Sequence, residues 1–168
     1  MDGVLVKYGV DDYKGDDPIW LRKSQHYFLN LEPDYTMIHI ADMIHRHCEQ
    51  TEDEMYILTS LSAKNMIFNE HFHDKILWLN KFMPYIDINH ILISVTNKRD
   101  TVEYITNHDI TRHDILIDDY NKNLQEWTVC NGTSVKYCNG INNPDSFAGK
   151  KIYHNRSADD AVAILLTI

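Results

Sequence analysis

Three short apolar runs in the sequence are each followed by side chains that could bind phosphate or a metal ion. Thr59 and Ser60 end the first run, Lys98 follows the second, and Asp118 and Asp119 follow the third. Hydroxyl and ammonium groups bind phosphate oxygens, and neighbouring carboxylates are ligands that Mg²⁺ prefers. If the fold brings the three segments together, these residue types predict a site for a small phosphorylated ligand and a divalent cation.

The runs that precede these residues have the pattern of buried strands. They are continuously apolar rather than alternating, which is typical of parallel strands covered by helices on both faces. We expect strands over residues 55–59, 90–95 and 114–117, and a weaker strand over 134–137. In a parallel sheet the carboxyl ends of the strands meet at one edge, where ligands bind. The candidate phosphate and metal ligands are therefore expected to converge there.

Helices are predicted between these strands by apolar residues that recur every three or four positions. The spacing covers residues 38–48 and 72–83, a shorter helix is expected around 102–105, and Ser157 is placed to cap a last helix. Strands that alternate with helices predict an α/β, Rossmann-like fold with a parallel sheet flanked by helices.

Length and composition indicate one domain over residues 1–168, with 43% hydrophobic and 24% charged residues. The longest apolar run, Ala161–Leu166, is far shorter than the roughly 18–20 residues of a membrane helix, so no membrane partner is expected. The N-terminus lacks the basic and apolar regions of a secretory signal. Three cysteines without a C-x-x-C pair argue against a disulfide framework, so we expect a cytoplasmic location.

The charges argue against binding to duplex nucleic acid. Lys and Arg minus Asp and Glu give 16 − 25 = −9, and duplex binding depends on neutralising phosphates with cations. A small phosphorylated ligand needs only a few local cations or a metal. The pairs His45-x-His47 and His71-x-His73 are poor zinc candidates, because residues two apart on a helix point in different directions.

Together with the start of the chain, the strand-end residues resemble the haloacid-dehalogenase superfamily of phosphotransferases. Its four motifs are a D-x-D-G loop, a Thr or Ser, a Lys, and a group of acidic residues, each at the end of a strand. The segments similar to them here are Asp2–Leu5, Thr59, Lys98 and Asp118-Asp119, in the family order and over most of the chain.

Within that superfamily the chain is most similar to the 5′(3′)-deoxyribonucleotidases. Residues 28–33, 57–60 and 114–119 resemble segments of that family. The resemblance implies that residues 8–33 form part of a small helical cap over the site. Three aromatic residues of this cap would then contact the base of a nucleoside monophosphate: Trp20, Tyr27 and Phe28.

The resemblance also implies a Mg²⁺-dependent mechanism. An aspartate attacks the phosphorus, and a second aspartate, here Asp2, acts as general acid and base. Thr59 and Lys98 would stabilise the transferring group, and Ser60 would contact the substrate phosphate. The implied metal ligands are Asp2, Asp118 and Asp119.

The sequence departs from the family pattern at its start. The first Asp of D-x-D-G is the nucleophile, but Met1 stands at the x position and Asp2 at the second Asp. The nucleophile and the family's central first strand would precede Met1, so the chain as it stands is expected to be inactive. Either the natural protein starts earlier or the truncation is natural. Without that strand two interior strand edges would lack partners, at about 1–3 kcal/mol for each buried unpaired group.

Each motif also has a plainer structural interpretation. Thr59 and Ser60 can simply end a strand, Asp118 and Asp119 can form a polar turn, and Lys98, like Arg99 beside it, can be a solvated cation. The cap aromatics can likewise be core residues.

Three hypotheses follow. The first is a phosphomonoesterase acting on (deoxy)nucleoside 5′-monophosphates, and the second is an inactive relative that binds a nucleotide or a protein partner. The third is a structural chain whose exposed sheet edge pairs with a partner, for example in a homodimer.

Overall fold

The computed structural model describes residues 1–7, 26–61, 68–141 and 144–167. Its strands are β1 (Ile57–Ser60), β2 (Ile91–Ser94), β3 (Ile115–Asp118), β4 (Thr133–Cys138) and β5 (Lys150–Tyr153). Its helices are α2 (Tyr35–Cys48), α3 (Phe68–Phe82), α4 (Lys98–Thr106), α5 (Asn121–Val129) and α6 (Ala158–Leu165). Short 3₁₀ turns lie at η2 (Phe28–Asn30), η3 (Ile88–His90) and η4 (Pro144–Ser146). Within the described residues, every helix is too short or too polar to cross a bilayer.

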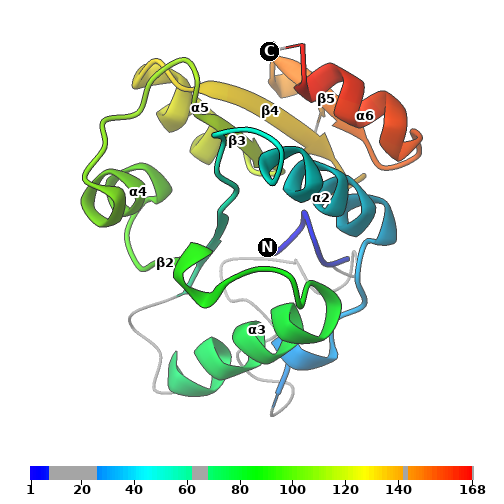
Figure 1. Ribbon diagram of the computed structural model, residues 1–168, viewed down its shortest axis with the longest axis vertical. Helices are drawn as coiled ribbons and strands as arrows, with labels where there is room; N and C mark the ends of the chain where they lie inside the picture. Colours follow the sequence, from blue (N-terminus) through cyan, green and yellow to red (C-terminus); the bar gives the residue numbers. More distant parts are fainter. Residues whose placement is uncertain (8–25, 62–67, 142–143, 168) are drawn as a thin grey trace.

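The strands form two small parallel sheets, with the orders β1–β2 and β3–β4–β5. Helices flank both sheets (Figure 1), so the predicted α/β class with parallel strands is confirmed, and the arrangement is compatible with a Rossmann-like fold. The four predicted strands are present with bounds shifted by one or two residues. Strand β5 and helix α5 were not predicted, because two lysines begin the former and only Leu124 and Trp127 are buried in the latter.

The strands β1 and β3 belong to different sheets, and each has one edge without a strand partner among the described residues. The N-terminal segment lies between the two sheets, where Met1, Val4, Leu5 and Val6 are buried in the main hydrophobic core (Figure 1). The Met1 amino group donates to the carbonyl of Leu58 on β1 at 3.5 Å. The amino end therefore occupies the edge of β1 in place of a strand.

A hydrophobic core joins the N-terminal segment to both sheets. It contains Ile57 of β1 and the inward residues of β4 and β5, and it is covered by the buried faces of α2 and α6. Trp78 of α3 is fully buried, and its indole nitrogen donates to the carbonyl of Leu31 at 2.8 Å. A second, smaller cluster lies between β3 and α5 around Leu116, Leu124 and Trp127.

The segment predicted to form a cap is described only over residues 26–33, and residues 8–25, with Trp20, lie outside the described part of the chain. The described part carries η2, which packs against α3. The chain then returns beside the N-terminal segment through a bridge between Pro33 and Val6. The amide of Asp34 donates to the carbonyl of Leu5 at 2.8 Å, which fixes this return.

Candidate functional site

The fold places Thr59 and Asp118 near the carboxyl ends of β1 and β3, as the strand pattern predicted. Both side chains are almost fully buried. Lys98 does not lie in a loop but is the first residue of α4. The side chain of Asn97 accepts a hydrogen bond from the amide of Asp100 at 2.7 Å, which is the N-cap contact that begins this helix. The cap therefore determines where the Lys98 side chain leaves the backbone.

Asp118 and Lys98 form a buried ion pair with an Nζ–Oδ2 distance of 2.5 Å. The same carboxylate accepts hydrogen bonds from the Asn123 side chain at 3.0 Å and from the amide of Tyr120 at 2.7 Å. Burial acts to raise the pKa of Asp118, but the Lys98 charge and these hydrogen bonds outweigh it and lower the pKa. Asp118 is therefore held as an anion.

A second buried lysine, Lys75 of α3, completes the site and was not predicted. Its ammonium group contacts the carboxylate of Asp2 and donates to Thr59 Oγ1 at 2.9 Å and to the carbonyl of Ser60 at 2.9 Å. Burial lowers its pKa, although the Asp2 carboxylate opposes the shift. The sequence held a signal for this residue, because Lys75 lies within the apolar stripe predicted on this helix, where a lysine needs a buried anion.

Asp119 lies against the loop that contains Gly3. A β-carbon on Gly3 would lie 2.3 Å from Asp119 Oδ2, and the φ of 71° at this residue also favours glycine. Asn139 joins the two segments, donating to the Gly3 carbonyl at 2.6 Å and to Asp119 Oδ2 at 3.0 Å. Burial and the neighbouring charge of Asp118 raise the pKa of Asp119 to about 6.

The amino group of Met1 lies among these charged side chains. Burial, together with the charges of Lys98 and Lys75, lowers its pKa to about 5, against the opposing effect of Asp2 and Asp118. The main chain at this point is therefore close to the groups that the motifs predicted to act on phosphate.

The oxygen atoms of the site suit a hard cation such as Mg²⁺. Oδ1 of Asp2 is buried and has no hydrogen-bond partner among the described residues. An unpaired buried carboxylate oxygen is costly, and a cation would satisfy it. The resemblance assigns Mg²⁺ to Asp2, Asp118 and Asp119, but within the described part of the chain these three residues do not form a group whose ligand atoms all lie within 4.8 Å of one another. In the present arrangement, Asp2 and Asp118 are instead paired with Lys75 and Lys98.

The residues predicted to contact substrate lie in different surroundings. Ser60 is exposed at the end of β1. Phe28 is only 3% exposed, with the ammonium group of Lys75 4.3 Å from its ring centroid and the ring of His71 at 4.9 Å. Tyr27 packs edge-to-face on Phe28 at 5.3 Å. Phe28 therefore supports the lysine of the site and is largely covered itself.

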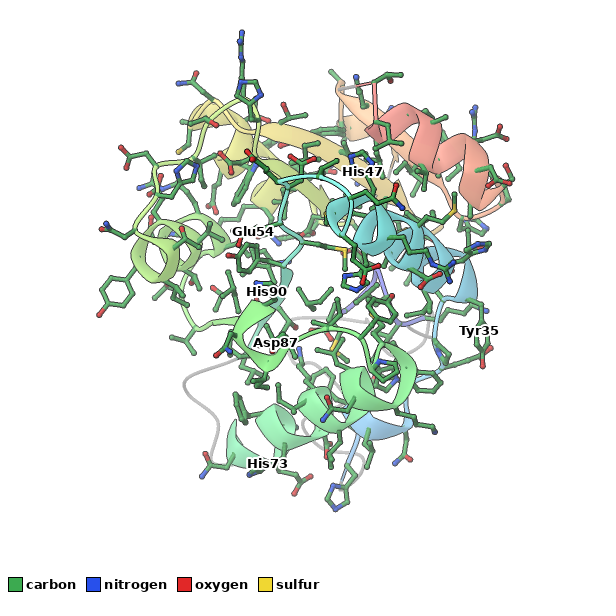
Figure 2. The ribbon with its side chains drawn as sticks, viewed as in Figure 1. Tyr35, His47, Glu54, His73, Asp87 and His90 are labelled. Atoms are coloured by element: carbon green, nitrogen blue, oxygen red, sulfur yellow. The ribbon has the colours of Figure 1, made fainter. Side chains whose placement is uncertain are left out.

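The histidine pairs considered for zinc do not converge. His71 is buried, whereas His73 lies on the outer side of α3 (Figure 2). On α2, the ring of His45 stacks on Tyr85 at 4.7 Å, and the ring of His47 faces Asp53 at 3.4 Å. The structure therefore agrees with the expectation that residues two apart on a helix point in different directions.

Comparisons of the chain with protein-family models, with curated proteins and with solved structures give no match. The interpretation of the site therefore depends on its own geometry and chemistry.

Proposed function

We propose that this chain carries the phosphate- and Mg²⁺-binding part of a phosphomonoesterase site of the haloacid-dehalogenase type. The observation that supports the proposal is the convergence of buried lysines, carboxylates and a hydroxyl group on the strand ends around the Met1 amino group. Ammonium and hydroxyl groups can hold phosphate oxygens while the carboxylates hold the cation. The converging residues are Asp2, Thr59, Lys75, Lys98, Asp118 and Asp119.

In this proposal Lys75 and Lys98 neutralise charge that develops on the transferring phosphoryl group, and Thr59 donates a hydrogen bond to it. Asp2 protonates the leaving oxygen and then removes a proton from the attacking water. Bound Mg²⁺ supplies positive charge that offsets the repulsion between the carboxylates and the phosphate.

The attacking carboxylate of this mechanism belongs one residue before Met1. It forms a bond to phosphorus as the ester oxygen leaves, and water then hydrolyses the resulting aspartyl-phosphate. The proposed substrates are (deoxy)nucleoside 5′-monophosphates. In this proposal Tyr27 supplies aromatic surface for the base, Phe28, being covered, supports Lys75, and Ser60 contacts the phosphate; the third predicted aromatic, Trp20, lies outside the described residues.

The test compares two extended chains that carry the same apolar strand before Met1, one ending in Asp and the other in Asn. With Mg²⁺ and a deoxynucleoside monophosphate, we expect phosphate release from the Asp form and none from the Asn form. Circular dichroism establishes that both forms fold. Equal rates from the two folded forms, or no release from either, would contradict the proposal.

A second function, phosphate binding without hydrolysis, is favoured by the ion pair between Asp2 and Lys75. The chain as it stands then binds a nucleoside monophosphate and Mg²⁺ and releases no phosphate. Calorimetric titration with the nucleotide, followed by a phosphate assay of the same sample, separates the two functions. Turnover by the unextended chain would exclude the binding-only function.

A further inference from the structure

A second group of metal-binding side chains lies where the segment after residue 25 meets α3. Nδ1 of His26 is 2.8 Å from Oδ1 of Asp74, and the amide of His26 donates to Oε1 of Glu70 at 2.9 Å. One ligand atom from each of these three residues lies within 4.8 Å of the others. The group shares no residue with the candidate phosphate site.

Helix α3 places the two carboxylates of this group side by side. Glu70 and Asp74 are four residues apart, so they project from the same face of the helix. Both come from one rigid element, and His26 approaches from a separate segment. An ion bound by all three would therefore join the two parts of the chain.

Asp74 shows that the pairing in this group is incomplete. The residue is only 1% exposed, and its Oδ2 has no hydrogen-bond partner among the described residues. This oxygen belongs to the carboxylate whose other oxygen contacts His26. Leaving a buried carboxylate oxygen unpaired costs at least about 1–3 kcal/mol. The ion pair with His26 does not remove this cost, but a cation bound between the three side chains would.

We propose that His26, Glu70 and Asp74 bind a divalent transition-metal ion, with Zn²⁺ as the representative of the class. An imidazole nitrogen favours such ions over Mg²⁺ and Ca²⁺, which prefer oxygen ligands alone. In a tetrahedral site, ligand atoms at about 2.0–2.2 Å from Zn²⁺ lie about 3.3–3.6 Å apart. The separation of 2.8 Å between His26 and Asp74 is that of a direct hydrogen bond, so these two ligand atoms would move apart by about 0.5–0.8 Å to admit the ion. All three ligand atoms already lie within 4.8 Å of one another. The exposed position of His26 leaves the other coordination positions to water.

The test is calorimetric titration of the metal-free protein with Zn²⁺, compared with Glu70→Gln and His26→Ala. Glu70→Gln keeps an oxygen that can accept from the His26 amide and keeps the His26–Asp74 pair, but it removes a charged ligand. We expect one site in the parent protein and a loss of at least about 10-fold in affinity in each variant, because even outer-shell partners of metal ligands contribute about 10–100-fold.

His108→Ala is the matched control. His108 and Asp114 also form an exposed pair, at 3.1 Å, but no group of three ligands includes them within the described part of the chain. This variant is expected to bind Zn²⁺ as the parent does. In a parallel titration with Co²⁺, we expect the visible absorption of the bound ion to be kept in His108→Ala and lost in His26→Ala. The proposal is overturned if the parent binds no Zn²⁺, or if Glu70→Gln and His26→Ala bind it with the parent's affinity.

Discussion

Among the described residues, three lysines bring ammonium groups into the interior, and each meets oxygen acceptors near the strand ends. Lys75 and Lys136 are fully buried, and Lys98 is 9% exposed. A buried charge costs several kcal/mol unless it is paired. Lys136 donates to the main-chain oxygen of Asp119 at 3.1 Å and also contacts Asn121, so it holds the acidic loop in place. The net charge of −9 is therefore compatible with the proposed phosphate site, because these cations act locally.

Replacing Lys75 tests its role in phosphate binding. We expect Lys75→Met to weaken the affinity for inorganic phosphate in Mg²⁺ by about 10- to 100-fold, since a hydrogen bond between charged groups contributes about 1.5–3 kcal/mol. Calorimetry measures the change, and thermal melting establishes that the variant folds. The control is Lys81→Met, which removes an exposed lysine from the same helix. Equal affinities for the two folded variants would show that Lys75 has no part in binding.

Asp114 provides a pH-dependent contribution away from the site. Its carboxylate accepts from the amide and the hydroxyl of Thr111 at 2.7 and 2.8 Å. Burial acts to raise the pKa of Asp114, but these bonds and His108 lower it below 3.8. The stabilisation is therefore complete above pH 3.8 and is lost as the pH falls through the lower pKa of the folded state.

We accordingly expect Asp114→Asn to reduce the free energy of unfolding by about 1 kcal/mol at neutral pH. The reduction is expected to shrink in acid solution. Urea unfolding at about pH 7 and about pH 3 measures both values. If Asp114→Asn reduces the free energy of unfolding equally at both pH values, the charge of the Asp114 carboxylate is not the source of the stabilisation.

At the scale of elements, the start of α4 connects stability to the site. Asn97→Ala removes the N-cap and is expected to cost about 0.5–2 kcal/mol in the free energy of unfolding. Because the cap precedes Lys98, we also expect weaker phosphate binding. Ser157→Ala is the matched control, since the Ser157 side chain caps α6 at 3.2 Å and is not part of the candidate site. If Asn97→Ala and Ser157→Ala lose similar stability and both keep the parent's phosphate affinity, the α4 cap does not contribute to phosphate binding.

The strands that sequence could predict are those with continuous apolar runs, and their ends correctly placed Thr59 and Asp118. Sequence could not predict that Lys75 reaches Thr59, because this contact joins a helix to a strand end that only the tertiary structure brings together. The short helix α5 was missed because two buried residues give too weak a period. Local patterns therefore predicted most of the elements, and with the resemblance they named every converging residue except Lys75, whereas the buried ion pairs depended on packing between distant segments.

At the scale of the whole molecule, the buried Met1 amino group links stability to pH. Its pKa is about 5 in the folded state and 8.0 as a free group. Between these values the unfolded chain binds more protons, so stability rises with pH, by up to about 1.4 kcal/mol per pH unit. Acetylation of the amino group should remove this contribution. Urea unfolding from about pH 5 to pH 8 measures the free energy of unfolding as a function of pH. We expect this free energy to rise less steeply with pH for the acetylated chain. Equal slopes for the two chains would show that the amino group is solvated rather than buried.

The separation of β1 from β3 also bears on how the molecule opens. Among the described residues, the strand-to-strand pairing runs within each sheet and not between them, and side-chain packing around the N-terminal segment joins the two. Such a joint can loosen without breaking the pairing within either sheet, so we expect the two halves to open as separate cooperative units. Native-state hydrogen exchange is then expected to give one opening free energy for the amides of β1 and β2 and another for those of β3, β4 and β5. A ligand that contacts both halves would raise the lower value toward the higher, and the molecule would then open as one unit.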